Sequence, residues 1–388
     1  MNVVIHSPGL RLAHGGAAHS EASLARYLSR EISVKVLAAK QNCDPNFVAQ
    51  MGCPTPTLYR TWDPIVALML KSHWLHDWLN GVDIFHLNGH WKVENFFFAR
   101  LCHQKKIPYV FHPRGMLWLE GRRPVLKRLY NLVFGHWIVA HANSVIALSE
   151  FEKRHFESYE IESSRVTVIA NGIDPNLDVD GPVKKERCFI YLGRIESRKK
   201  LDSLLLSFAE YLKSGGQFSL KLVGPVERGY DEVLRRLEVQ LGIQGKIEWI
   251  APQYGKAKWE SLKAASALIY PAIEEAFGRV PFESLWVGTL PVVPIESGAY
   301  EYLKGRIPDV FYPVGALDSL TQVLISIEKN IDSEIWISKI QEAQKYVRNE
   351  FSWRHVIHHV LKLYRNTVGL TQGETESLVF EPSHRYLS

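Results

Sequence analysis

The sequence lacks the features that identify several classes of protein. Its 388 residues include only four cysteines, and no two of them form a Cys-x-x-Cys pair, so neither a disulfide framework nor a zinc cluster is predicted. No run of about 18 apolar residues occurs, which excludes a membrane-spanning helix. The opening residues MNVVIHSPG have no basic stretch followed by a long apolar one, so they do not predict a signal peptide. We therefore expect a cytoplasmic protein.

A large excess of charge of one sign is also missing. The 46 lysines and arginines exceed the 41 aspartates and glutamates by only 5, so the net charge does not predict nucleic-acid binding. Apolar residues make up 46% of the chain and charged residues 22%, which is the composition of a folded globular protein. The length favours two domains, because one domain usually has about 150 residues.

Short apolar runs alternate with helical patterns along the chain. In the first half, the runs predicted as strands are residues 3–5, 34–37, 83–87, 109–111, 144–147 and 166–169. After the polar stretch 174–187, the predicted strands are residues 188–192, 219–223, 246–250, 267–270 and 291–294. Strands separated by helices favour parallel sheets with crossover connections. The sequence thus predicts an α/β protein of two Rossmann-like, doubly wound domains that face a central cleft, where the ligand binds.

The most informative stretch is residues 270–294, YPAIEEAFGRVPFESLWVGTLPVVP. A predicted strand ends at its start, and a loop leads into a helix whose first turn contains Pro281. Backbone N–H groups around Phe277 therefore lie at a helix N-terminus, where phosphate or sugar oxygens bind. Glu275 lies in the loop and Glu283 about one turn into the helix. Carboxylates at these places suit the paired hydroxyls of a sugar.

This stretch resembles the paired-glutamate signature of the family-4 retaining glycosyltransferases (glycosyl transferases group 1), which have the GT-B fold. Besides the two glutamates, it shares Phe277-Gly278 between them and the Pro-Val-Val of residues 291–293 after them. Tyr191–Arg194 followed by Lys199 resembles the family's donor-phosphate pair, in which an arginine and a lysine neutralise a diphosphate leaving group. Lys200 stands where the family usually has glycine, which leaves open which lysine faces the ligand.

Motifs of the first half agree with this resemblance. Gly15-Gly16 resembles the family's glycine loop, which approaches the donor, and HPRGML of residues 112–117 resembles a motif of one branch of the family. Family members have a histidine near this position that contacts the donor sugar and phosphate. A structural histidine in a turn is the alternative for His112. Asn171–Asp174 resembles the turn that ends the first domain, and Phe351–Trp353 with the helical pattern after it resembles a helix that crosses back to that domain.

The resemblance covers roughly residues 1–366. It implies where the domains begin and end and which residues are functional. The implied segments are an acceptor-side N-terminal domain 1–173, a linker 174–187, a nucleotide-sugar-binding domain 188–348, a returning helix 349–367 and a loose tail 368–388. The residues implied for catalysis are Glu275, Arg194, Lys199 and His112. Those implied for donor binding are Gly15, Gly16, Asn171, Ala276, Phe277, Gly278, Val280 and Glu283.

The reaction implied by the resemblance is a retaining transfer of a sugar from a nucleotide-diphosphate sugar to a glycan or lipid-linked acceptor, in surface or exopolysaccharide synthesis. The resemblance implies that the enzyme needs neither a metal nor a cofactor. Two alternatives stay open: a nucleotide-sugar epimerase of the same fold, and a non-catalytic nucleotide-sugar-binding subunit. Asp178-Val179-Asp180 imitates the metal-binding motif of the other large glycosyltransferase fold, but it lies in the polar linker and is predicted to be solvated.

Residues 103–128 carry a local excess of positive charge. They contain seven lysines and arginines and one acid, Glu120, which gives a net charge of +6. Aromatic side chains lie among them, and residues 125–138 fit an amphipathic helix. Such a face suits an anionic membrane surface or a lipid-diphosphate acceptor, which would place the protein peripherally on the inner face of the plasma membrane. A solvated basic face is the alternative.

Overall fold

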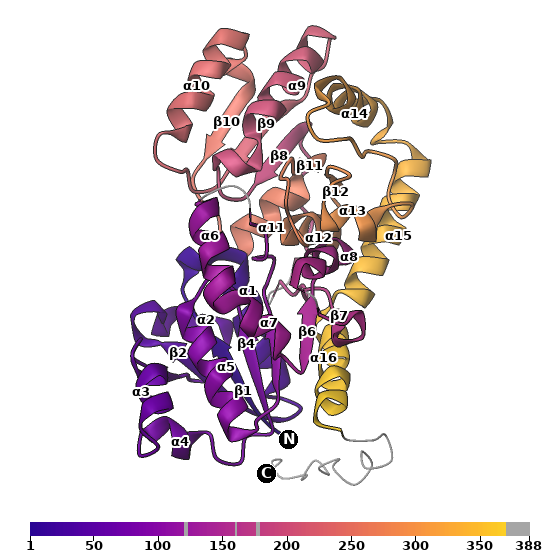
Figure 1. Cartoon of the computed structure of the whole chain (residues 1–388). Coiled ribbons are helices and arrows are strands. Elements are labelled where there is room, and N and C mark those ends of the chain that lie inside the picture. Colours follow the sequence, from indigo (N-terminus) through magenta and orange to yellow (C-terminus); the bar gives the residue numbers. More distant parts are fainter. Residues whose placement is uncertain (120–122, 160, 176–178, 370–388) are drawn as a thin grey trace, which may run out of the picture.

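The computed structural model describes residues 1–119, 123–159, 161–175 and 179–369. They form two parallel β-sheets, one of seven strands from the first half of the chain and one of five strands from the second (Figure 1). The predicted α/β fold with two parallel-sheet units is therefore confirmed. Residues 370–388 of the predicted tail, Asp178 of the Asp-x-Asp motif, and Glu120 and Arg122 of the basic segment lie outside the described residues.

The first sheet has the strand order β3-β2-β1-β4-β5-β6-β7. Its strands are β1 (Asn2–Ser7), β2 (Ser33–Ala39), β3 (Thr57–Tyr59), β4 (Ile84–Asn88), β5 (Tyr109–His112), β6 (Ser144–Ala147) and β7 (Val166–Val168). The ends of neighbouring strands align: Ser7 pairs with Ala38, and Ala39 pairs with Tyr59. The residues that follow the strands therefore gather along one edge, where open parallel sheets bind ligands.

Helices cover both faces of the first sheet. They are α1 (Gly15–Leu28), α2 (Pro45–Met51), α3 (Asp63–Met69), α4 (Trp74–Trp78), α5 (Val93–Lys105), α6 (Pro124–Tyr130), α7 (His136–Ala140) and α8 (Glu150–Arg154). A π-helical turn, η3 (Asn131–Gly135), joins α6 to α7. Because side chains alternate along a strand, Val3 and Ile5 of β1 pack in one apolar cluster with Ala22 of α1, whereas Val4 packs in another with Phe98 of α5.

The second sheet has the strand order β10-β9-β8-β11-β12. Its strands are β8 (Cys188–Leu192), β9 (Ser219–Val223), β10 (Ile247–Ile250), β11 (Ala267–Ile269) and β12 (Leu290–Val292). The helices around it are α9 (Leu201–Lys213), α10 (Tyr230–Leu241), α11 (Gly255–Ala264), α12 (Arg279–Trp286), α13 (Gly298–Leu303), α14 (Leu317–Asn330) and α15 (Glu334–Glu350). Both sheets thus have the doubly wound arrangement.

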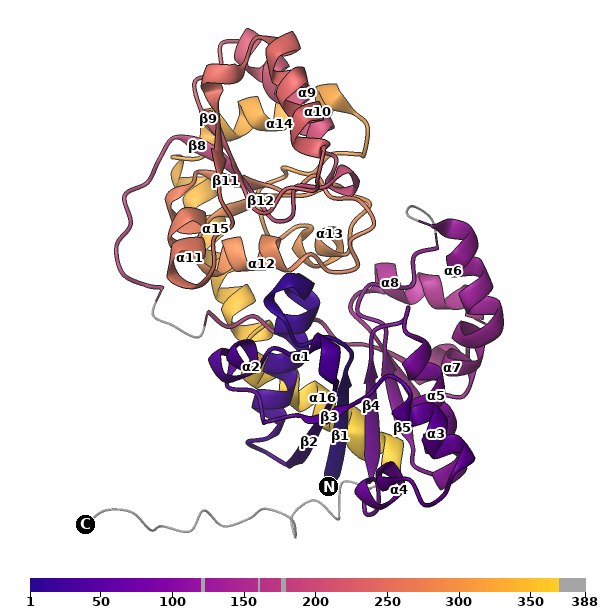
Figure 2. The ribbon, with the colours of Figure 1, turned by 90° about the vertical axis from the view of Figure 1, so that its left-hand side faces the viewer.

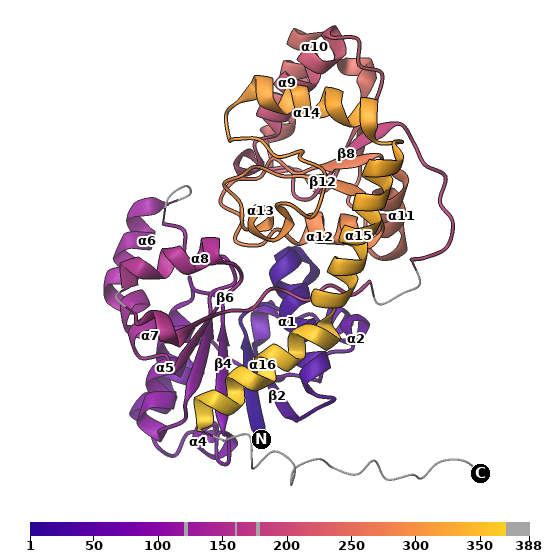
Figure 3. The same cartoon turned by 90° about the vertical axis from the view of Figure 1, so that its right-hand side faces the viewer.

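The last helix, α16 (Trp353–Val368), leaves the second half and runs along the first sheet (Figures 2 and 3). The Ser352 side chain begins this helix by accepting a hydrogen bond from the N–H of His355. Trp353 and Tyr364 belong to the same apolar cluster as Ile5 of β1. A Cβ atom at Gly172 would lie 2.3 Å from the Trp353 ring, so only glycine fits where the chain leaves the first half.

Candidate active site

Lys199 lies at the ligand edge of the second sheet. The turn η6 (Ser197–Lys199) follows β8, and Lys200 ends it in the left-handed conformation with a φ of 53°. Lys199 is only 8% exposed, and its amine contacts the carboxylate of Glu275. Burial lowers the pKa of the Lys199 amine to about 7. The neighbouring carboxylate of Glu275 has the opposite effect, because it favours the protonated amine. The two side chains therefore form an ion pair at the site.

Arg194 and Glu283 are grouped with this pair around Tyr270. The amine of Lys199 lies 5.5 Å from the centroid of the Tyr270 ring. Burial raises the pKa of the Tyr270 hydroxyl, and the charges of Arg194 and Glu283 both act on it. Arg194 is the exposed member of the group, with 57% of its side chain accessible, and it lies 3.8 Å from Glu196. The four charged residues predicted from the second-half motifs therefore lie at one edge.

The loop before α12 is fixed from several sides. The ring of Phe277 stacks on that of Phe282 with their centroids 4.2 Å apart. The Ala276 carbonyl oxygen accepts a 2.5 Å hydrogen bond from the hydroxyl of Ser149, which belongs to the first half. Gly278 enters the helix with a φ of 68°, and no side chain caps this N-terminus. The first turn, which includes Val280, thus begins with backbone N–H groups directed at the loop.

Glu283 lies one turn into α12 and is buried among cations. Its carboxylate lies 3.0 Å from the amine of Lys258 and 3.2 Å from the guanidinium of Arg279. Burial alone would raise the pKa of Glu283, but the charges of Lys258 and Arg279 outweigh burial and lower that pKa. Sequence reasoning missed both cations. Arg279 follows Gly278 within the motif and offered a signal, whereas Lys258 lies on α11 and offered none.

Arg279 also connects the second half to the glycine loop of the first. One of its nitrogens donates to the carbonyl oxygen of Gly16 at 3.2 Å. Gly15 has a φ of 63°, and its carbonyl oxygen accepts from Nδ1 of His19 at 3.0 Å. Burial, with a further contribution from Arg279, lowers the pKa of His19 to about 4, so this ring is neutral at pH 7. Gly15 and Gly16, predicted as a glycine loop, form the start of helix α1, and this start lies against α12.

His112 ends β5 at the ligand edge of the first sheet. The residue is buried, and neither ring nitrogen has a hydrogen-bond partner among the described residues. Burial and the charge of Arg114 hold its pKa well below the ordinary value, so the ring is neutral. The guanidinium of Arg114 donates to Asn88 and to Asn171, each at 2.9 Å. His112 and Asn171 thus form a group around Arg114, on which the charge of Arg279 from the second half also acts.

The burial of Arg114 corrects the predicted basic face. Arg114 contributes one charge to the net +6 of residues 103–128, but it is buried and amide oxygens bind it inside the first half, so it does not belong to an exposed basic face. Its neighbour Gly115 lies at the junction of the halves, where a Cβ atom would be 3.2 Å from that of Ala276. No group of three side chains suited to a metal ion occurs in the described parts of the chain.

Known families match nearly the whole chain. Residues 15–172 match the Glycosyl transferase 4-like domain, and residues 174–343 match Glycosyl transferases group 1. An uncharacterized glycosyltransferase of Methanocaldococcus jannaschii is 23% identical over 306 residues, which cover 73% of this chain and 75% of the relative. A D-inositol 3-phosphate glycosyltransferase of Nocardioides is 25% identical over 261 residues. That match covers 59% of this chain and only 54% of the relative.

Solved structures share the fold at low sequence identity. Anabaena HepE in complex with UDP has a TM-score of 0.77 at 16% identity, over 94% of this chain and 100% of HepE. Its complex with UDP-glucose has a TM-score of 0.74 at 17% identity, with the same coverage. The predicted GT-B architecture is confirmed by these likenesses. With both halves matched by glycosyltransferase domains, the chain belongs to the GT-B glycosyltransferases of group 1.

Proposed function

We propose that this glycosyltransferase uses a nucleotide-diphosphate sugar as its donor and retains the anomeric configuration. The observation that carries the proposal is the contact of buried Lys199 with Glu275, beside Arg194, at the ligand edge of the second sheet. An amine and a guanidinium there supply positive charge to a diphosphate as it leaves. The complexes of HepE with UDP and UDP-glucose support a nucleotide sugar as donor and make UDP the first nucleotide to test.

Glu275 and the backbone of residues 276–278 hold the sugar ring in this proposal. Glu283 accepts hydrogen bonds from the ribose hydroxyls, because its carboxylate is ionised and fixed at the start of α12. From the first half, the neutral ring of His112 donates a hydrogen bond to the leaving phosphate, and the Gly15-Gly16 backbone closes over it. Neither nitrogen of His112 has a hydrogen-bond partner in the described part of the chain, which supports this role.

The transfer step uses the donor's own phosphate as the base. The acceptor oxygen attacks the anomeric carbon on the face from which the phosphate departs. A new carbon–oxygen bond forms as the bond to the phosphate oxygen breaks and its electron pair leaves with the phosphate. That phosphate oxygen then takes the acceptor's proton. Arg194 and Lys199 neutralise the charge that develops, so we propose that the reaction needs no metal.

The test is transfer from UDP-glucose and other nucleotide sugars, with the product anomer read by NMR. We expect an α-linked product from an α-linked donor and full activity in EDTA. Arg194→Ala should lower turnover about a hundredfold, whereas Arg236→Ala, on the far helix α10, should leave it unchanged. A β-linked product would refute retention. Donor conversion without an acceptor would indicate an epimerase, and binding without turnover a non-catalytic subunit.

We also propose that the acceptor is a glycan or lipid-linked sugar of a surface polysaccharide, met at an anionic membrane. None of the helices in the described part of the chain combines the length and apolar composition needed to cross a bilayer. The continuous run of α6 and η3 instead presents an exposed apolar face. Its exposed apolar residues are Val125, Leu126, Leu129, Leu132 and Val133. Arg123 and Arg128 are exposed beside them, which suits anionic headgroups.

Vesicle co-sedimentation tests this contact. We expect the protein to pellet with phosphatidylglycerol-containing vesicles and much less with pure phosphatidylcholine vesicles. Leu132→Ser, at a residue that is 78% exposed, should reduce pelleting severalfold, whereas Val239→Ser on α10, 61% exposed, should not. Equal binding to both vesicles, or equal effects of both variants, would remove the membrane proposal and leave a solvated basic face.

A further inference from the structure

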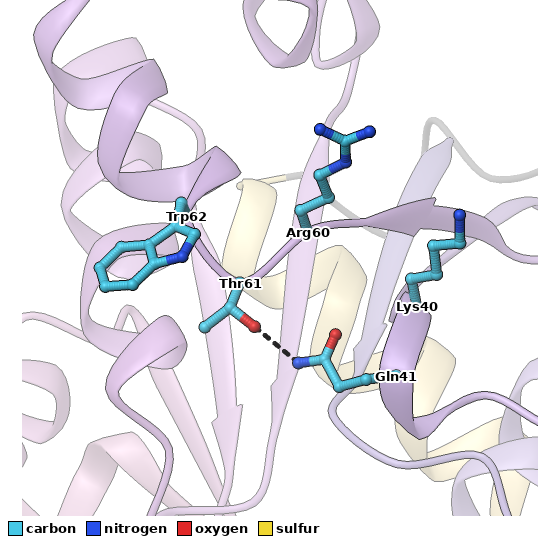
Figure 4. Close-up of a pocket in the computed structure, with 5 residues that line it drawn as sticks. All are labelled: Lys40, Gln41, Arg60, Thr61 and Trp62. Atoms are coloured by element: carbon cyan, nitrogen blue, oxygen red, sulfur yellow. Dashed lines mark hydrogen bonds between the residues drawn. The ribbon is translucent and has the colours of Figure 1, made fainter.

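A hollow lies at the ligand edge of the first sheet, beyond the glycine loop. It has a volume of about 510 Å³ and is lined by Lys40, Gln41, Arg60, Thr61 and Trp62 (Figure 4). Gln41 donates to the Thr61 hydroxyl at 2.6 Å, which joins the two segments that form its floor. Figure 4 shows the side chains of Lys40 and Arg60 extending to the same side. None of the roles described above uses these residues.

The register of the sheet brings the two cations together. Lys40 and Arg60 directly follow Ala39 and Tyr59, which pair as the last residues of β2 and β3. Neighbouring strands lie about 4.8 Å apart, so two positive side chains leave the edge almost side by side. The two positive charges repel each other, and an anion between them would offset this repulsion.

No acid in the described part of the chain pairs with either cation. Neither the amine of Lys40 nor the guanidinium of Arg60 has an ion-pair or side-chain hydrogen-bond partner among the described residues. Asp63 lines a neighbouring hollow with both cations, but its carboxylate binds other groups there: it accepts from the backbone N–H of Arg60 at 2.8 Å and lies 3.7 Å from the ring of His73. The two side chains are therefore available to two oxygens of one phosphate or carboxylate.

One tryptophan lines each of two hollows that share these cations. Trp62 is 70% exposed at the first hollow. A second hollow of about 470 Å³ shares Lys40 and Arg60 with it and is also lined by Trp74. Exposed indole rings pair an apolar face with a polar N–H group, which suits the apolar face and hydroxyl rim of a sugar ring. The chemistry of the site is thus that of a carbohydrate carrying a negative charge.

We propose that these two hollows bind the acceptor through an anionic sugar, with the phosphate or carboxylate between Lys40 and Arg60 and the sugar rings on Trp62 and Trp74. The role as acceptor rests on the function proposed above, whereas the binding itself does not. β2 pairs with β1, whose following segment leads to Gly15-Gly16, so the hollows lie on the same edge as the donor loop.

Binding of small probes to the free protein tests the inference. Isothermal titration with glucose 6-phosphate, glucuronic acid and glucose should show at least tenfold tighter binding of one or both anionic sugars than of glucose. The double variant Lys40→Ala/Arg60→Ala should lose this preference. The matched variant Lys256→Ala/Arg236→Ala removes two exposed cations of the second half and should keep it. Trp62→Ala should weaken all the probes, and Trp62→Phe should restore binding.

UDP titrated into the same variants separates the two proposals. We expect UDP affinity to stay within about twofold in the Lys40→Ala/Arg60→Ala variant. Equal affinity for glucose and both anionic sugars, or an unchanged preference in that variant, would overturn the anionic-sugar site. If the sugars bind as expected but no nucleotide does, the donor proposal fails and the site stands. The tighter of the two anionic probes identifies the charged group.

Discussion

The two ligand edges that face each other across the molecule hold their charges in different ways. At the second sheet, cations lie against carboxylates: Lys199 contacts Glu275, and Lys258 and Arg279 flank Glu283. A cation held by a carboxylate can bind a phosphate only if the two anions exchange or share it. An anionic ligand that binds to the second half must therefore rearrange these ion pairs.

At the first sheet, Arg114 donates its side-chain hydrogen bonds to neutral partners, although its charge also acts on the buried carboxyls of Glu21 and Glu152. Amide oxygens of Asn88 and Asn171 hold Arg114, and His112 is uncharged. These contacts do not compete with an anionic ligand, so they fix positions whether or not the ligand is present. From this difference we predict that charge stabilisation depends mainly on the second half and positioning on the first.

The sharpest way to break this comparison is to remove the buried amine. Lys199→Ala should lower turnover by about a hundredfold to a thousandfold, because it removes positive charge placed for the leaving diphosphate. Steady-state kinetics with UDP-glucose measures the effect, if that donor is active. The neighbouring Lys200→Gly serves as control and should keep wild-type turnover. Normal turnover in Lys199→Ala would assign the charge to another residue.

Substitution of His112 in the first half should have a smaller effect, which lowers turnover and leaves nucleotide binding nearly unchanged. His112→Ala should lower turnover about tenfold to a hundredfold, as the loss of one positioned hydrogen-bond donor does, and should change UDP affinity less than threefold. Because the His112 ring is neutral, the pH profile of turnover should show no ionisation that disappears in this variant. A variant that loses UDP affinity and keeps turnover would place His112 in ground-state binding.

Glu21 on α1 tests the neutral character of the first half through stability. Burial raises its pKa from 4.5 to about 7, although Arg114 opposes the shift. The folded state thus keeps the proton that the unfolded chain loses near pH 4.5, so stability from this group is complete at low pH and is lost as the pH rises through 7. The shift corresponds to about 3 kcal/mol at pH 8.

Glu21→Gln keeps the side chain neutral at every pH and should remove this loss. Its Tm should exceed that of the wild type by several degrees at pH 8, and the difference should shrink toward pH 5. Differential scanning calorimetry at both pH values measures it. Glu232→Gln, at an exposed position of α10, should show the same Tm difference at both. A constant offset for Glu21→Gln would mean that the carboxyl is already ionised in the fold.

The smallest expected effect concerns the turn that presents Lys199. Lys200 has a φ of 53°, a conformation that costs a residue with a Cβ atom about 1 kcal/mol relative to glycine. Lys200→Gly should therefore raise Tm slightly without changing turnover. Glu210→Gly, at an exposed position inside α9, should lower Tm by a similar amount. A large loss of turnover in Lys200→Gly would show that Lys200, and not Lys199, reaches the ligand.

Much of the fold could be predicted because buried parallel strands are short continuous apolar runs. The strands over Cys188–Leu192 and Ser219–Val223 were predicted with the bounds that the structure shows. β3 was missed, because its three residues lie close after Pro54 and Pro56 and show no apolar pattern of their own. The helix predicted over residues 125–138 is interrupted by a π-helical turn. The spacing of apolar residues does not indicate such a turn.

The site could be predicted only where its residues are neighbours in sequence. Glu275 and Glu283 share one motif, and the structure places both at the start of α12. The contacts of Glu283 with Lys258 and of Arg279 with Gly16 depend on how α11 and the first half pack against α12. The burial of Arg114 could not be predicted for the same reason, since its amide partners, Asn88 at the end of β4 and Asn171 after β7, are distant in sequence.

The carbonyl group of Ala276 has a further consequence. It accepts the Ser149 hydroxyl from one half, and Gly298 packs so tightly on it from the other that a Cβ atom would lie 1.9 Å away. A molecule that stabilises this loop must also change the free energy needed to separate the two halves. By thermodynamic reciprocity, anything that holds the halves together alters the affinity for that molecule by the same factor.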